Sequence, residues 1–403
     1  TSISDMPVNE VSKLIGYHVL YYSYNKEKLV NFRPTGSTET EEEQNIKAGL
    51  YYKHRTRSSD APTVETTPTG ASVMVYHLER YLPIFSYRYF QTKGIDAKNN
   101  YEAFYPNSTW TGDDGFNVSN ASVKEYGIIA NNGYIHAVDR VVEPLETIYT
   151  ELKNKEKYST FLDLYDSFGV YVADDELSKS YAKAYGVDTL YQYQHGGLPN
   201  IACEWPTSSY LNFTALTALS YSIFAPSNTA INSFFDSFWK IGGYSSMQEV
   251  DALALNYFLY QFIYGGSMLF PEELGDDELK NLAGSSLNIN PAALNEKTMC
   301  VNGALYGMDE IKEPSTFASV IGHLFQYKSA RSFLYALLGS SLFSSYVSDL
   351  SKYIVLVPTA EQFEASGIRT VYSTQGLEAE GDDGWAEISN TAKQNIVYLH
   401  SAS

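Results

Sequence analysis

The segment that decides the fold is Asn132–Pro144, NGYIHAVDRVVEP, because it returns in altered form as Asn302–Pro314, NGALYGMDEIKEP. The offset is a constant 170 residues (302 − 132), and the Asn, Gly, Asp, Glu and Pro positions coincide. Each copy has an Asn-Gly dipeptide, then an alternating apolar stretch, then a proline that ends it. An Asn-Gly pair supplies the positive φ angles of a tight turn, so the pattern predicts the same β-hairpin twice.

A second element recurs, within a residue, as Tyr221–Ile231, YSIFAPSNTAI, and as Tyr353–Phe363, YIVLVPTAEQF. Each copy predicts an apolar strand, followed by Pro-Ser or Pro-Thr and the start of a helix. Ser227 and Thr359 are expected to cap the N-termini of these helices. An amphipathic helix is expected before each copy, over the ranges 159–165 and 331–338.

The third element is Leu14–Leu20, LIGYHVL, whose Tyr-His pair we expect in a strand. Its counterpart in the middle of the chain is Tyr260–Ile263, and Leu399–His400 is a candidate third copy. The three elements follow one another in a fixed order along the chain. That order predicts one complete repeat between two partial ones.

These elements, in this order, resemble the fasciclin-like domain, and the resemblance covers most of the chain. The family's Phe-Ala-Pro strand is matched by Phe224–Ile231, its Tyr-His strand by Tyr17–Val19, and its closing motif by Asn132–Pro144. The chain departs from the family pattern at Ile231, Gln261 and Tyr306. The resemblance implies an α+β fold of tandem domains, each a small β-sandwich or wedge with helices packed on one side.

The expected domains are 1–147, which lacks its opening half, 148–312, which is complete, and 313–403, which lacks its closing half. Two insertions, about 31–115 and about 170–209, indicate surface loops, where specific contacts often lie. Two explanations of the partial repeats stay open. The missing halves lie outside this sequence, or the N-terminal and C-terminal halves assemble into one composite domain and so cover their exposed edges.

The composition argues against several classes of partner. The 403 residues hold 28 Lys and Arg against 47 Asp and Glu, a formal charge of −19, which repels nucleic acid and anionic lipid headgroups. The apolar stretches 205–235 and 252–271 contain too many polar and breaking residues for a membrane span. We therefore expect membrane attachment only through an anchor outside this chain.

The sequence leaves open whether Cys203 and Cys300 form a disulfide.

No residue pattern indicates catalysis, so we expect a protein that is not an enzyme, with no cofactor and no metal site. The carboxylate pairs at 113–114, 174–175, 276–277 and 382–383 are typical of solvated loops. No two histidines have a metal-binding spacing, and no nucleophile elbow or phosphate loop is present. His18 and His136 are expected in strands, with one ring nitrogen bonded to the backbone or to a carboxylate.

Tyrosine is the unusual residue of the composition, with 35 copies. Its rigid ring and hydroxyl group suit contact surfaces, and tyrosines gather in the two insertions. The candidate binding residues are Tyr17, His18, Tyr87, Tyr89, Tyr101, Tyr105, Tyr191 and Tyr193. Tyr17 and His18 come from the family resemblance, in which the Tyr-His region is linked to adhesion. Asn-x-Ser/Thr sequons occur at Asn107, Asn117, Asn120 and Asn212.

The sequence favours a non-enzymatic adhesion or binding protein at the cell surface, with a protein or a glycan as its partner. The composition is also similar to that of surface lipoproteins of Bacteroidetes-type bacteria. The alternative is therefore an accessory subunit of an outer-membrane nutrient-uptake complex with a TonB-dependent transporter. A broad apolar patch would favour a protein partner, whereas a concave tyrosine-lined groove with Asn or Asp at its rim would favour a glycan.

Overall fold

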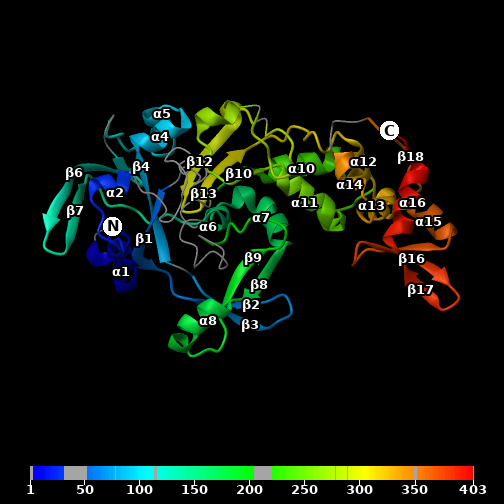
Figure 1. Cartoon of the computed structure of the whole chain (residues 1–403), viewed down its shortest axis with the longest axis horizontal. Coiled ribbons are helices and arrows are strands. Elements are labelled where there is room, and N and C mark those ends of the chain that lie inside the picture. The colour runs from blue at the N-terminus through cyan, green and yellow to red at the C-terminus, as the bar shows by residue number, and fades with distance from the viewer. Residues whose placement is uncertain are drawn as a thin grey trace. The chain divides into compact units, whose positions relative to one another are not determined.

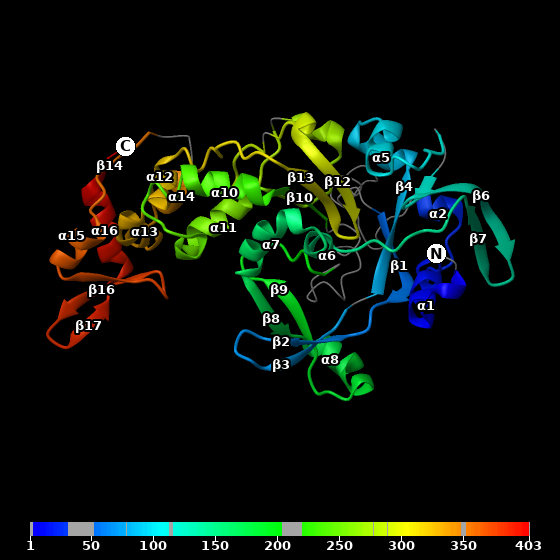
Figure 2. The same ribbon diagram turned by 180° about the vertical axis from the view of Figure 1, so that it is seen from behind.

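Helices and small sheets alternate along the whole chain, and the predicted α+β class is confirmed. The computed structural model describes residues 3–30, 52–77, 79–112, 116–203, 220–276, 278–287, 289–347 and 352–402 (Figure 1). Parts of the expected insertions, at 31–51, 113–115 and 204–209, lie outside the described residues, as do Asn212 and the Asp113–Asp114 pair. Figure 2 gives the view from behind.

The chain forms two compact units, and each unit is made of three separate segments of the sequence. Unit 1 comprises residues 1–227, 262–281 and 287–309, and unit 2 comprises residues 228–261, 282–286 and 310–403. The domain boundaries expected after residues 147 and 312 stay predictions.

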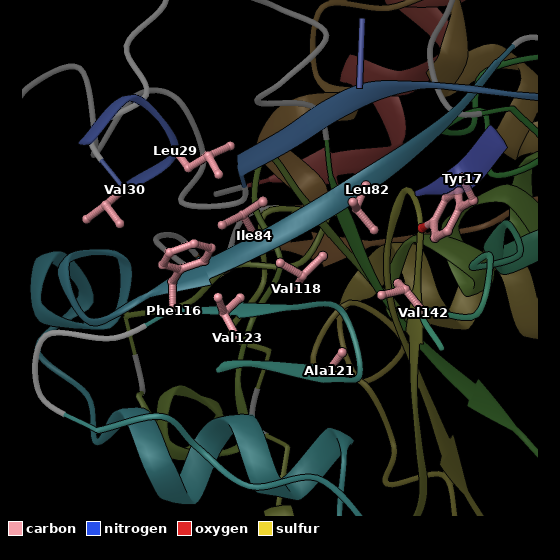
Figure 3. Close-up of a cluster of buried hydrophobic side chains, with 10 residues drawn as sticks. All are labelled: Tyr17, Leu29, Val30, Leu82, Ile84, Phe116, Val118, Ala121, Val123 and Val142. Atoms are coloured by element: carbon pink, nitrogen blue, oxygen red, sulfur yellow. The ribbon is translucent and has the colours of Figure 1, made fainter. Parts of the chain in front are cut away.

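The first sheet of unit 1 is antiparallel throughout and has the strand order β1-β4-β5-β6-β7. Its strands are β1 (Tyr52–Ser59), β4 (Glu79–Ser86), β5 (Phe116–Val118), β6 (Ala121–Ala130) and β7 (Gly133–Val138). A buried apolar cluster lies against this sheet (Figure 3) and consists of Tyr17, Leu29, Val30, Leu82, Ile84, Phe116, Val118, Ala121, Val123 and Val142. This cluster fixes the N-terminal helices on the sheet, because two of them supply its first three members.

The second sheet of unit 1 has the order β11-β10-β13-β12, in which β10 and β13 run parallel. Its strands are β10 (Tyr221–Pro226), β11 (Ile263–Gly265), β12 (Leu294–Cys300) and β13 (Gly303–Met308). The β12–β13 hairpin matches the β6–β7 hairpin in register, since Cys300 faces Gly303 as Ala130 faces Gly133. Both predicted hairpins are therefore confirmed.

The turns of these hairpins lie one residue earlier than predicted. Residues 131–132 and 301–302 make the turns, and each glycine is the first residue of the following strand. Gly133 has no positive φ, whereas Gly303 has a φ of 143°. A Cβ atom at Gly303 would lie 1.9 Å from the Tyr221 carbonyl oxygen of β10, so close approach of the two strands requires this glycine.

The third sheet of unit 1 joins the two expected insertions. Its order is β2-β3-β9-β8, from β2 (Thr63–Thr66), β3 (Ser72–Val75), β9 (Tyr191–His195) and β8 (Gly169–Ala173). β3 lies parallel to β9, and the Tyr76 amide donates to the Tyr191 carbonyl at 3.0 Å. These parts of the insertions are thus ordered strands rather than the loops that their composition indicated.

The helices of unit 1 are α1 (Val8–Tyr17), α2 (Lys26–Val30), α4 (Tyr87–Lys93), α5 (Ala97–Phe104), α6 (Ile148–Lys153), α7 (Ser159–Asp166) and α8 (Asp175–Tyr181). The amphipathic helix expected at 159–165 is α7. Thr147 caps α6, and Asp174 caps α8 by accepting from Glu176 and Leu177 amides at 3.1 and 3.0 Å. Asp174 is buried, so this carboxylate is not the solvated loop group that we expected.

Unit 2 contains the helices α10 (Asn228–Ser237), α11 (Ala252–Tyr260), α12 (Val320–Gln326), α13 (Arg331–Leu338), α14 (Phe343–Val347), α15 (Ala360–Ala365) and α16 (Asn390–His400). Its strands are β14 (Ile354–Val355) paired with β18 (Ser401–Ala402), and β15 (Ile368–Val371), β16 (Gly376–Gly381) and β17 (Gly384–Glu387) in a second sheet. Phe234, Trp239, Phe258 and Phe317 form its aromatic core, with ring centroids 5.1 to 6.1 Å apart.

Two predictions for unit 2 are confirmed directly. The helix expected at 331–338 is α13, and Thr359 caps α15 by accepting from the Gln362 amide in a capping box. Short 3-10 turns complete the description of both units, at Ile3–Asp5, Glu156–Tyr158, Ala182–Tyr185, Met247–Glu249, Pro271–Gly275, Pro291–Ala293 and Lys328–Ala330.

The Tyr-His element is the C-terminal turn of a helix, which corrects the strand that we expected. α1 ends at Tyr17, and the exposed His18 is bonded through Nδ1 to the carbonyl oxygen four residues earlier, at 2.9 Å. Gln261 after α11 and His400 at the end of α16 bond the carbonyl at the same spacing, at 2.9 and 2.7 Å. The three sequence copies therefore share one local structure, a side chain that satisfies an orphan carbonyl of a helix end.

His136 lies in β7, as expected. Its Nε2 is 2.9 Å from the Tyr24 carbonyl oxygen, and the ring is half-buried against Phe116. The predicted bond of a ring nitrogen to the backbone is confirmed.

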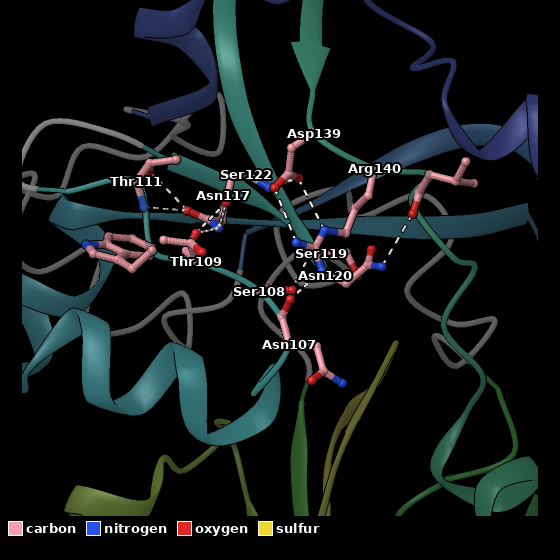
Figure 4. A network of polar contacts seen from close by, with 12 residues as sticks. Asn107, Ser108, Thr109, Thr111, Asn117, Ser119, Asn120, Ser122, Asp139 and Arg140 are labelled. Carbon is pink, nitrogen blue, oxygen red and sulfur yellow. Dashed lines mark hydrogen bonds and ion pairs between the residues drawn. The ribbon is translucent and has the colours of Figure 1, made fainter.

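A polar network around β5 and β6 contains three of the four sequons (Figure 4). Asn117 is fully buried, accepts from the Thr111 amide at 3.1 Å and donates to the Thr109 carbonyl at 3.0 Å. Asn107 is exposed, and its carbonyl accepts from Arg140. Asn117 therefore holds a loop against the sheet, and its amide is not accessible in the folded chain.

We expect Gly303→Ala to destabilise the chain by about 3 kcal/mol or more, because a Cβ there overlaps the β10 backbone. The control is Gly275→Ala, since a Cβ at Gly275 meets nothing within 4 Å. Scanning calorimetry of both variants checks this. Equal Tm values for the two would contradict the close approach of β10 and β13.

We expect Asn117→Ala to lower the free energy of unfolding by about 2 kcal/mol, because buried donors and acceptors of the loop lose their partner. Asn107→Ala, at an exposed site in the same loop, serves as the control and should change stability little. Urea unfolding measures both. A smaller effect at Asn117 than at Asn107 would show that the network does not hold the loop.

Candidate functional site

A polar cleft of about 520 Å³ lies within unit 1, and we call it the tyrosine cleft. It is lined by Lys13, Asp60, Ala61, Thr63, Glu65, Val75, Tyr76, His77, Arg80, Glu146, Thr147, Tyr149, Thr150, Lys153, Gln192, Tyr193, Ala202 and Cys203. This volume falls in the range of small-molecule sites in proteins. The lining combines aromatic rings with cations and carboxylates, so it is suited to a ligand that has both polar and apolar faces.

The two insertions supply most of the cleft wall. The first contributes the β2 and β3 strands and Arg80 at the start of β4, and the second contributes Gln192 and Tyr193 on β9. The parallel pairing of β3 with β9 brings these distant segments together. α6 also lines the cleft, through Tyr149, Thr150 and Lys153. The insertions therefore line much of the cleft, and the specific contacts expected there stay a prediction.

Arg80 organises the charged part of the cleft. Its Nη2 lies 2.5 Å from Asp60 Oδ2 and 2.9 Å from Glu146 Oε2, and its Nη1 donates to the Leu145 carbonyl at 2.5 Å. Lys13 Nζ lies 2.5 Å from the other oxygen of Asp60. Burial acts to raise the pKa of Asp60, but Arg80 and Lys13 together hold that pKa below its ordinary value.

Asp166 is the centre of a second network, behind the Tyr193 wall. It accepts from the Tyr193 and Tyr149 hydroxyls at 2.9 and 3.2 Å, and His195 Nε2 lies 3.1 Å from Oδ1. The Tyr171 hydroxyl donates to Glu65 at 2.8 Å. Burial, followed by the Asp166 charge, raises the pKa values of Tyr149 and Tyr193, so these phenols stay protonated donors.

The rings of this network pack on one another. The Tyr193 centroid lies 5.6 Å from Tyr149, 5.0 Å from Tyr171 and 5.0 Å from His195. Burial and Glu65 raise the pKa of Tyr171 to about 12. Because each hydroxyl is anchored on a carboxylate and each ring on another ring, the wall is a rigid, preorganised surface.

The eight predicted binding residues occupy different parts of unit 1, and only Tyr193 lines the cleft. Tyr191, on the same strand, is half-buried beside Val75. Tyr87 on α4 and Tyr105 after α5 are half-buried, and His18 is exposed at the end of α1. The structure does not bring the eight together into one site. Their role in binding stays a prediction.

For Tyr17, Tyr89 and Tyr101 the structure corrects the expected exposure, because all three are fully buried. The Tyr17 hydroxyl donates to the Tyr81 carbonyl at 2.9 Å, and the Tyr101 hydroxyl donates to the Ser119 carbonyl at 2.8 Å. Satisfied phenols of this kind can lie inside a core at little cost. The clustered aromatics of the first insertion are therefore mainly core.

Sequence reasoning missed most of the cleft. Asp60, Arg80, Tyr149 and Asp166 are isolated residues in unrelated stretches, with no spacing that links them. The one available signal was the alternation Tyr191-Gln192-Tyr193-Gln194-His195, which is typical of a half-buried strand that presents one row of rings.

The described ranges contain no group of three His, Cys, Asp or Glu side chains able to hold a metal ion. No helix in them combines the length and apolar character needed to cross a membrane. Cys203 and Cys300 are not joined in a disulfide. Burial raises the pKa of the Cys300 thiol well above its ordinary value.

Comparison with known proteins gives distant similarity to solved structures. No family model matches the chain, and no curated protein matches it. Among solved structures, the chain is similar to a FAS1 domain pair from the insect cell adhesion molecule Fasciclin I, with a TM-score of 0.25 and 12% sequence identity. The match covers 76% of this chain and 81% of the other. A similarity at this level does not place the chain in that family.

We expect Asp60→Asn to lower the Tm by a few degrees at pH 7, because Arg80 and Lys13 lose a carboxylate partner. The folded-state pKa of Asp60 lies below its ordinary 3.8, so its contribution is present above that pH and is lost as the pH falls through the folded value. The Tm difference between wild type and variant should therefore shrink below about pH 4.

Calorimetry between pH 3 and pH 7 measures this difference. Asp382→Asn, at an exposed turn residue, controls for loss of one negative charge at pH 7. A Tm difference of the same size at both ends of the range would show that the Asp60 ion pairs do not stabilise the cleft.

Proposed function

We propose that the protein is a non-enzymatic binding protein that acts outside the cell, and that the tyrosine cleft takes a carbohydrate. The observation that carries this proposal is the concave wall of Tyr149 and Tyr193, with Asp60 and Glu65 in the same cleft. A sugar presents apolar C–H faces that pack on aromatic rings and hydroxyls that bond carboxylates. A groove of this form is what distinguishes a glycan site from a flat protein interface.

The charge of the cleft fits a neutral ligand. Its lining has as many cations as carboxylates, namely Lys13, Arg80 and Lys153 against Asp60, Glu65 and Glu146. Burial lowers the pKa of His77, so its imidazole is neutral at pH 7. The chain as a whole carries −19, so this balance is local. A neutral glycan experiences little electrostatic repulsion there.

Binding rather than catalysis is proposed because the carboxylates of this region are already engaged. Asp60 is held by two cations, Glu146 by Arg80, Glu65 by the Tyr171 hydroxyl, and Asp166 by two phenols. Each carboxylate keeps lone pairs that can accept a sugar hydroxyl, because its two oxygens have about four acceptor sites. Its charge is already stabilised by these partners, which makes it a poor general base.

The proposed place of action, the cell surface, is supported by the resemblance of the repeated elements to fasciclin-like domains and by the acidic surface. Adhesion through a cell-surface glycan is the simplest form of this function. An accessory role beside an outer-membrane transporter uses the same cleft to present a captured glycan. Purification of the tagged protein from its native membrane, with mass spectrometry of its partners, distinguishes these two roles.

The binding proposal is tested with a glycan array, followed by titration calorimetry of the best neutral oligosaccharide. We expect Tyr193→Ala to weaken Kd about tenfold or more, because the ligand loses one aromatic face. Tyr193→Phe keeps the ring and removes the bond to Asp166, so it should weaken binding less. Tyr22→Ala, at an exposed tyrosine outside the cleft, is the matched control.

Circular dichroism and the Tm establish that the variants are folded. A Kd that is unchanged by Tyr193→Ala would place the glycan elsewhere on the chain. An array with no bound glycan would overturn the proposal.

A further inference from the structure

The pairing of β10 with β13 shows what a complete strand arrangement of this repeat looks like. β10 has two neighbours, β13 in parallel register and β11 in antiparallel register. Ile223 lies beside Leu305 on one side and beside Ile263 on the other. The pairing of β10 with β13 is therefore an internal template, that is, an example within the chain of how these two strands pair and in which register.

β14 is the counterpart of β10 in unit 2. Residues 353–358 match 221–226 in sequence, and Val355 faces Ser401 of β18 as Ile223 faces Ile263 of β11. The backbone bonds agree as well, since the Leu356 amide donates to His400 at 2.8 Å and the Phe224 amide donates to Phe262 at 2.9 Å. Among the described residues β14 pairs with β18 alone, so the neighbour equivalent to β13 is missing there.

β7 is the counterpart of β13 in unit 1. The β6–β7 hairpin has the register of β12–β13, with Ile128 facing Ile135 as Thr298 faces Leu305. Within the described ranges, β7 is an edge strand whose sheet partner is β6. Figure 2 shows the hairpin extending beyond β1 and β4. In the part of the chain that the structure describes, β7 thus lacks the neighbour equivalent to β10.

The exposure of matched residues supports this reading of the two edges. Leu305 of β13 and Ser222 of β10 are both 0% exposed, whereas their counterparts, Ile135 of β7 and Ile354 of β14, are 55% and 71% exposed. Apolar side chains on an open strand edge form a template for another strand. Among the described strands, neither edge has the neighbour that the other would supply.

An apolar pocket of about 410 Å³ lies beside β14 within unit 2. Its lining includes Val320, Leu324, Tyr327, Val355 and Val357. In β-strand addition, backbone hydrogen bonds give affinity and pockets for alternate side chains give specificity. The acceptor edge therefore has both a strand and a pocket.

We propose that two copies of this chain join by strand addition, with β7 of one copy lying parallel to β14 of the other. The internal template sets the register, so Ile135 lies beside Val355 and Tyr134 beside Ile354. A second copy is the occupant because every chain carries one edge of each kind in matching register. The contact is head-to-tail, so it permits rings or short filaments. This inference does not depend on the tyrosine cleft.

Sedimentation velocity of the 403-residue chain, from roughly 1 to 100 μM, tests the association. We expect oligomers that increase with concentration, and a dissociation constant raised about tenfold or more by Ile135→Lys, since the new charge would be buried at the contact. Leu356→Lys should have the same effect from the acceptor side. Val8→Lys, at an 85% exposed residue outside both edges, is the matched control.

Cysteine crosslinking tests the register in a Cys203→Ala background, in which Cys300 stays buried. Mixing the Ile135→Cys protein with the Val355→Cys protein should give a disulfide-linked dimer on oxidation. The control mixture of Ile135→Cys with Val8→Cys should give much less. Unchanged Tm values show that the exposed-site variants are folded.

A chain that is monomeric over the whole range, with no adduct above the control mixture, overturns the proposal. A disulfide that forms only inside the Ile135→Cys/Val355→Cys double variant, in the monomer band, also overturns it. That result would show that the two edges pair within one chain. Association that both lysine variants leave unchanged would place the contact on another surface.

Discussion

The Asn302-Gly303 dipeptide is the constraint on which unit 1 depends. Gly303 lets β13 approach β10 more closely than any side chain would allow. The buried Asn302 accepts from the Ile148 amide at 2.9 Å and donates to the Ile201 and Cys203 carbonyls at 2.9 and 3.1 Å. One residue pair thus fixes the central sheet, the start of α6 and the end of the second insertion. Because α6 carries Tyr149, the same pair also positions one wall of the tyrosine cleft.

The cleft shows how an acidic chain builds a site of balanced charge. Asp60 and Glu146 share Arg80 as an ion-pair partner, and Asp166, outside the cleft lining, accepts hydrogen bonds from phenol hydroxyls. Pairing offsets part of the desolvation penalty that partly buried charges incur. The Tyr149 and Tyr193 rings thus form a rigid wall, because both hydroxyls are held by hydrogen bonds to Asp166. Rigidity of this kind favours recognition, because little side-chain entropy is left to lose on binding.

The repeats explain which strands have a neighbour on both sides and which strands lie at a sheet edge. Leu305 and Ser222 of the β13–β10 pair are buried, whereas their counterparts Ile135 of β7 and Ile354 of β14 are exposed. An exposed edge with an apolar face is costly for a soluble protein unless a partner covers it. The sequence similarity between the covered strands and the uncovered strands therefore indicates where a partner strand would bind.

The sequence by itself determined the repeated elements, the two hairpins and the helices α7 and α13, because each follows from local periodicity and turn chemistry. The α+β class was implied by the resemblance of the repeated elements to fasciclin-like domains. The sequence predicted a strand at the Tyr-His element, which is in fact the end of a helix. The seven residues 14–20 are equally compatible with a helix end whose last side chain bonds the carbonyl four residues earlier. Of the cleft it found only Tyr193. The meeting of Arg80, Asp60, Tyr149 and Tyr193 was decided by the tertiary structure alone, since non-local strand pairing between two insertions leaves no spacing in the sequence from which it can be predicted.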